Sequence, residues 1–141
     1  MVMKRALIAA LGMVVVSCAI GEGPKKTIAP KASWQEIEAN AAAIDGNQVA
    51  VCGWFVAEFE GCEVSKSIPA NPGEAGQIWI APSSDICSLE NVTAHPTEGW
   101  AEISGTFHYS QDPNKGFGQF GMFRSAIGKA VVKIRKTPCD K

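Results

Sequence analysis

Few side chains in this sequence suggest acid–base chemistry. His95 lies in an irregular polar stretch, and His108 lies at the end of an alternating stretch that also holds Glu102. A histidine and a carboxylate can act as acid and base, but no nucleophile or metal-ligand spacing accompanies them. The Ser-Ser-Asp run at residues 83–85 lacks the Gly-x-Ser-x-Gly setting of a hydrolase. We therefore expect no catalytic residue, no metal site and no cofactor, and we expect that the protein is not an enzyme.

The N-terminus has the pattern of an export signal that ends at a cysteine. A basic pair at residues 4–5 precedes an apolar run, residues 6–16, which is shorter than the ~20 residues that span a bilayer. Ser17, a small residue, comes directly before Cys18. This pattern resembles the lipobox of bacterial lipoproteins, in which the signal is removed and the cysteine is acylated. The resemblance implies a lipoprotein signal peptide at residues 1–17 and lipid attachment at Cys18. The alternatives are an ordinary secretory signal and an uncleaved anchor.

Lipid attachment would also predict where the protein lies. Two or more acyl chains, such as palmitate, hold a protein stably on a membrane. Ala19, rather than aspartate, follows the cysteine, which in a bacterium with two membranes implies the outer membrane and its periplasmic face. Residues 18–32 contain glycine, proline and lysine without a periodic apolar face, so we expect a tether. The folded domain would then be residues 33–141.

The four other cysteines fit a pair of disulfides in an oxidising compartment. These are Cys52, Cys62, Cys87 and Cys139. No two of them are close in the sequence and none form a Cys-x-x-Cys motif, which argues against a zinc site and against thiol-redox chemistry. Four thiols allow three connectivities. Alternation in the surrounding strand points Cys52 outward, where the tail holding Cys139 could reach it. We therefore expect Cys52 to pair with Cys139 and Cys62 with Cys87.

Two tryptophans form the first candidate binding surface. Trp54 and Trp100 fall on the outward phase of two stretches that we expect to be adjacent strands. We expect Trp79 to face outward too, since the isoleucines on either side of it take the inward phase. Exposed tryptophans on a small barrel can form a stacking platform for sugars or bases. The alternative is that a helix carrying Trp34 covers them and makes a second, minor core.

The glycine-rich stretch at residues 110–124 is the second candidate. Glycines allow a backbone to approach a ligand closely, and they also form tight turns that can fold phenylalanine rings over an open barrel end. We favour the latter arrangement, a barrel plug, and expect Phe117 and Arg124 to stay accessible for ligand binding.

The surrounding elements are mainly strands. Ser33 and Glu36 have capping-box spacing and precede an apolar stripe, which predicts a short helix at residues 34–43. Gly53 and Gly105 occupy similar places in two alternating stretches, which indicates adjacent, curved strands. Five strands with a long excursion after the third favour a five-stranded, OB-fold-like Greek-key barrel. The expected strands are residues 48–59, 62–68, 77–81, 100–109 and 129–136.

Residues 34–135 also resemble a group of small exported bacterial OB-fold proteins of undetermined function. The matching residues are Gly46, Val49, Val51, Gly53, Trp54, Trp79, Gly105, Phe107, Gly118, Phe120 and Gly121. In that group, histidine often follows the first glycine of the last motif, whereas this chain has Gln119. The resemblance implies the fold and says almost nothing about activity.

The charge balance narrows the class of partner. The formal net charge is −1, and removal of residues 1–17 takes away two of the 13 basic side chains and none of the 14 acidic ones, which leaves −3. A nucleic-acid-binding domain needs a basic face, so we expect no nucleic acid. We expect a lipid-anchored module that binds a protein or a glycan of the cell envelope. The alternatives are a structural or assembly subunit, an inhibitor or immunity protein, and, least favoured, a hydrolase.

Overall fold

The computed structural model describes residues 28–58, 61–68, 76–81, 85–88 and 97–139. The predicted export signal, Cys18, most of the tether and His95 lie outside the described residues, so the predictions made for them stay predictions. Within the described part of the chain, no helix is long and apolar enough to cross a membrane.

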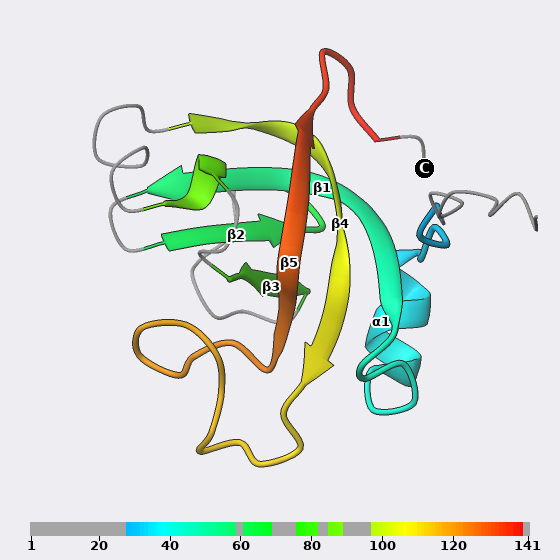
Figure 1. Cartoon of the computed structure of the whole chain (residues 1–141), viewed down its shortest axis with the longest axis vertical. Helices are drawn as coiled ribbons and strands as arrows, with labels where there is room; N and C mark the ends of the chain where they lie inside the picture. Colours follow the sequence, from blue (N-terminus) through cyan, green and yellow to red (C-terminus); the bar gives the residue numbers. More distant parts are fainter. Residues whose placement is uncertain (1–27, 59–60, 69–75, 82–84, 89–96, 140–141) are drawn as a thin grey trace, which may run out of the picture.

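Five strands form one closed barrel in the order β1-β2-β3-β5-β4 (Figure 1). Neighbouring strands are antiparallel, except that β3 and β5 run parallel. A short helix, α1, and a single 3₁₀ turn, η1, accompany them. The expectation of a mainly β chain with one small barrel and one short helix is therefore confirmed. The bounds are α1 (Trp34–Asn40), β1 (Gln48–Glu58), β2 (Gly61–Ser65), β3 (Gln77–Ile80), η1 (Asp85–Cys87), β4 (Thr97–Tyr109) and β5 (Ser125–Ile134).

Alternate residues of each strand fill the barrel. Phe55 on β1 and Phe107 on β4 are completely buried, as are Ile103 and Ile127. Full burial of a large apolar side chain stabilises a fold by about 1.5–3 kcal/mol. The alternation therefore fixes which side chains of β1 and β4 face inward and which remain on the outer wall.

Two glycines allow the barrel to curve. β1 and β4 are paired neighbours, as their matching glycine patterns predict. Gly53 lies so close to the carbonyl oxygen of Ser65 that a Cβ would overlap it. Gly105 lies at a shift in register between β4 and β5, where a Cβ would come within 2.6 Å of the Gly128 carbonyl oxygen. Only a residue without a side chain fits such close approaches of two backbones.

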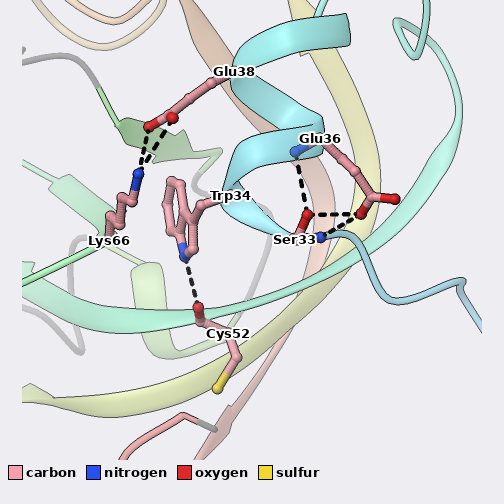
Figure 2. Close-up of polar contacts among 6 residues, drawn as sticks. All are labelled: Ser33, Trp34, Glu36, Glu38, Cys52 and Lys66. Carbon is pink, nitrogen blue, oxygen red and sulfur yellow. Dashed lines mark hydrogen bonds and ion pairs between the residues drawn. The ribbon is translucent and has the colours of Figure 1, made fainter. Parts of the chain in front are cut away.

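The N-terminus of α1 carries the expected capping box. The Glu36 backbone N–H donates to the Ser33 hydroxyl at 3.2 Å, and the Ser33 backbone N–H donates to the Glu36 carboxylate at 2.8 Å (Figure 2). These bonds, first from the Ser33 backbone and then from its hydroxyl, lower the pKa of Glu36. The helix ends at Asn40, earlier than the expected residue 43, because residues 41–43 form a turn instead.

The helix packs towards the inward side of β1. Ile37 is buried in the core, and the Trp34 indole N–H donates to the Cys52 carbonyl at 2.8 Å (Figure 2). That carbonyl is available because β1 pairs with β2 only from Trp54 onward. The Trp34 ring lies against inward-facing Gly53. The helix therefore does not provide the cover over outward-facing Trp54 that was the alternative expectation.

Both expected disulfides are present. Cys52 bonds Cys139, and Cys62 bonds Cys87, each with a Cα–Cα distance of 5.7 Å. The Cys52 sulfur points to the side of β1 opposite Trp34, where it fixes the C-terminal tail (Figure 2). Cys62 and Cys87 are buried, and their bond fastens η1 to β2.

Three strand boundaries differ from the expected ones. β5 begins at Ser125 rather than at residue 129, because Ser125, Ala126 and Ile127 are all buried and do not alternate. β4 begins at Thr97, three residues earlier than expected, and runs through Gly99. β2 ends at Ser65, three residues early. The loop between β4 and β5 is therefore residues 110–124.

Candidate functional site

A small hollow lies on the outer wall of the barrel, where β1, β2 and β3 meet the loop of residues 110–124. Its volume is about 70 Å³. Sites that enclose a whole small molecule measure ~300–1,000 Å³, whereas a water molecule occupies ~30 Å³ of liquid. The hollow therefore suits one chemical group at the end of a larger molecule. It is lined by Val56, Glu58, Gly61, Glu63, Trp79, Gln119, Phe120, Met122 and Phe123.

The floor of the hollow is a row of side chains across three strands. Val56 on β1 is paired with Glu63 on β2, and Glu63 is paired with Trp79 on β3. Directly paired residues bring their Cβ atoms to about 5 Å on the same face of a sheet. Ile78 and Ile80 point into the core, so Trp79 faces outward, as expected. The register thus places a carboxylate between an aliphatic and an aromatic side chain.

Trp79 is held between a glycine and an aromatic ring. Gly61 has φ +138°, and a Cβ there would overlap the six-membered ring of Trp79. The ring of Phe123, which is 5% exposed, lies with its centroid 5.4 Å from that of Trp79. The loop carrying Phe123 therefore lies against the outer wall. Phe123 packs on a tryptophan that faces outward, so this ring does not take part in the expected barrel plug.

The loop is stabilised by contacts of its own. Phe117 and Phe123 exchange backbone hydrogen bonds of 2.7 and 3.2 Å. The Arg124 guanidinium donates to the carbonyls of Ser110 at 2.8 Å and Gln111 at 3.1 Å, and lies 5.3 Å from the centre of the Tyr109 ring. Figure 1 shows that this loop joins the end of β4 to the start of β5. The C-terminal tail leaves from the opposite end of β5. Arg124 is exposed, as expected. Its guanidinium N–H groups are nevertheless bonded to backbone carbonyls and stabilise the conformation of the loop.

The hollow is acidic. Glu63 is half-buried, and its pKa is raised first by burial and then by the negative charge of Glu58. Gln77 donates to the Glu63 carboxylate at 3.4 Å. Glu98 on β4 is paired with Val56, so a third carboxylate borders the same face. None of the residues that line the hollow is basic.

The four side chains predicted to bind a ligand lie in two parts of the chain. Trp54 and Trp100 are directly paired and half-buried, with their rings edge to face at 5.6 Å. Phe117 and Arg124 follow the other end of β4. Phe117 is half-buried, with its ring centroid 6.5 Å from that of His108. The path along β4 from Trp100 to Tyr109 is ~30 Å at ~3.3 Å per residue. Along the chain, the tryptophan pair thus lies at β1 and the start of β4, and the loop pair follows the end of β4.

Sequence reasoning found parts of the hollow but not the hollow itself. Glu63 was not singled out, whereas Phe123 lies in the glycine-rich candidate stretch, and Trp79 was expected to face outward. Alternation in β2 could have placed Glu63 on the outer wall, but the register that joins it to Trp79 cannot be read from one strand. Gln119 did carry a signal, since it replaces a histidine frequent in the resembling group, and it lines the hollow.

The remaining polar candidates give no second centre. His108 Nδ1 lies 3.9 Å from the Asp45 carboxylate, which accepts a 3.0 Å hydrogen bond from the Tyr109 backbone. These contacts hold the end of β4 beside the turn after α1. Residues 83–84 of the Ser-Ser-Asp run lie outside the described residues. In the described part of the chain, no group of histidine, cysteine, aspartate and glutamate could hold a metal ion.

A second, wider hollow of about 450 Å³ lies between α1, residues 30–32 and residues 47–49. Its walls carry one basic and one acidic side chain, Lys31 and Glu36, and no aromatic ring. It offers a ligand neither a net charge nor a stacking surface.

Comparison with known proteins adds no family to these observations. No protein-family model matches the chain, and a search of curated proteins found no match.

Proposed function

We propose that this protein is a lipid-anchored binding module of the bacterial cell envelope, and that its barrel is an OB fold that captures a partner through the outer-wall hollow. The strand order β1-β2-β3-β5-β4 and the parallel β3–β5 pair support the OB-fold assignment. In OB folds, strands 2 and 3 and the loops after strands 1 and 4 bind the ligand. The hollow lies between β2, β3 and the loop that follows β4.

The observation that carries the proposal is the apolar rim around a half-buried carboxylate. Phe120 is 65% exposed and Met122 is 45% exposed, and both border the hollow that contains Glu63. A large exposed apolar side chain gains stability when a partner covers it. Methionine adapts to varied partner surfaces, and phenylalanine supplies a large contact area. A rim of this kind suits a binding surface.

The proposed location follows from the cysteines. Two disulfides are typical of a chain that folds in an oxidising compartment outside the cytosol. The lipobox pattern at Cys18 would supply the anchor, which in a bacterium with two membranes places the domain on the periplasmic face of the outer membrane. The partner would then be another component of the envelope. We propose binding without catalysis, because the described lining of the hollow joins its carboxylates to apolar and amide groups and offers no hydroxyl, thiol or imidazole beside them.

Site-specific photo-crosslinking in living cells tests the proposal. A photoreactive phenylalanine analogue would replace Phe120 at the rim or, as the control, Val131 on β5. The two positions have the same exposure, 65%. We expect a discrete adduct from position 120 that is absent from position 131. No adduct at position 120, or the same adducts at both positions, would refute the proposal.

A further inference from the structure

The hollow combines negative charge with aromatic walls. Half-buried Trp79 and exposed Phe120 supply ring surfaces, while Glu58 and Glu63 supply carboxylates. The face of an aromatic ring attracts a cation, and a carboxylate forms short, strong hydrogen bonds with an ammonium or guanidinium group. A ligand group with a cationic end and an apolar stem can interact favourably with both the carboxylates and the aromatic rings.

Among the described residues, the carboxylates of the hollow have no cationic partner. In the described part of the chain, neither Glu58 nor Glu63 forms an ion pair. The lysine that follows β2, Lys66, forms an ion pair with Glu38 on α1 at 3.3 Å (Figure 2). Arg124, which follows Phe123 directly, donates to loop carbonyls instead. Lys66 and Arg124 thus interact with other groups, and within the described part of the chain no basic side chain compensates the charge of the hollow.

We infer that the hollow takes the cationic end of a lysine or arginine side chain presented by a partner polypeptide. This inference rests on the proposed function and names the group that is recognised. The volume of about 70 Å³ accommodates the end of one side chain but not a sugar ring. The exposed rings and thioether of the rim would cover the apolar stem and the neighbouring residues of the partner. The raised pKa of Glu63 agrees with a carboxylate that is better stabilised when a cation is beside it.

A set of matched peptides tests the inference. The full mature chain, in detergent micelles, would be titrated with Ac-Gly-Lys-Gly-NH₂, its arginine counterpart and its Nε-acetyl-lysine counterpart, and with chitotriose. The readout is the NMR signal of the Trp79 indole N–H, assigned with Trp79→Phe. We expect both basic peptides to shift that signal with dissociation constants on the order of 1 mM, a weak single-group contact. The acetylated peptide, which keeps the stem but loses the charge, should bind at least about tenfold more weakly.

Variants on the same barrel locate the effect. Glu63→Gln should weaken binding of the lysine peptide about tenfold, and Glu58→Gln, at an exposed position, should weaken it about threefold. Glu102→Gln on the outer face of β4 keeps the same change of net charge away from the hollow and should leave binding unchanged.

The other outcomes separate this inference from the proposed function. Equal binding of the acetylated peptide, or binding of chitotriose instead of the basic peptides, would overturn recognition of a cation. No shift with any probe would also overturn it, while an adduct at position 120 in cells would leave the binding module standing.

Discussion

The close packing of the Trp79 ring on Gly61 can be tested by adding a single methyl group at residue 61. Gly61→Ala places a Cβ within the Trp79 ring at a backbone angle, φ +138°, that alanine rarely adopts. The backbone conformation costs about 1–3 kcal/mol, and displacement of the ring adds about 1–3 kcal/mol of overpacking. We therefore expect the free energy of unfolding to fall by roughly 2–6 kcal/mol in a urea titration. The adduct at position 120 should be lost as well, because Trp79 forms a wall of the hollow.

Gly99→Ala is the matched control. Gly99 also has a positive φ, +152°, but a Cβ there has no atom within 4 Å. The backbone cost and the smaller entropy of the unfolded chain are shared by both variants. The difference between them, about 1–3 kcal/mol, isolates the contact with Trp79. Equal losses of stability, together with an unchanged adduct in Gly61→Ala, would refute this account of how the hollow is built.

Three further predictions concern the bridges, the buried carboxylate and the anchor. Replacing Cys52 and Cys139 by alanine should lower the free energy of unfolding by up to about 4–5 kcal/mol, because the disulfide joins residues 87 positions apart. A loss below about 1 kcal/mol in a urea titration would show that the disulfide does not constrain the C-terminal tail. Because burial, and then the charge of Glu58, raise the pKa of Glu63 above 4.5 in the folded chain, this carboxyl costs no stability well below pH 4.5. It destabilises the fold progressively as the pH rises through 4.5, and fully once the pH exceeds the raised value. Glu63→Gln, which removes the repulsion from Glu58, should therefore be more stable than the parent at pH 7 and equal to it near pH 3, and a less stable variant at pH 7 would contradict this. Cys18→Ala should remove the acyl mass and release the protein from membranes, and an unchanged mature mass would rule out the anchor.

Alternation within single strands was enough to predict the barrel wall. The pattern in β1 correctly placed Cys52 outward, and from that direction the bridge to Cys139 followed. The boundary of β5 could not be predicted in the same way, because Ser125, Ala126 and Ile127 are buried in succession where the strand meets both β3 and the loop. Apolar and polar residues alternate along a strand when only one face of the sheet is buried. The alternation is lost where both faces of the strand are covered.

The hollow depends on information that no single stretch contains. Glu63 and Trp79 are adjacent because of the β2–β3 register, and Phe123 joins them because the loop after β4 folds back over β3. Exposed aromatic residues predicted a binding surface but not its position. The tryptophans expected to form it, Trp54 and Trp100, are half-buried and lie edge to face with each other.

Crosslinking from position 120 in living cells, with and without Glu63→Gln, tests the central claim most directly. Both chains keep the rim, the barrel and both disulfides, and they differ in one half-buried carboxylate. The account predicts that the adduct falls about tenfold in the variant and that the partner peptide joined to position 120 has a lysine or arginine beside the crosslink. An adduct of equal yield in both chains, or one joined to a segment without a basic residue, would contradict it.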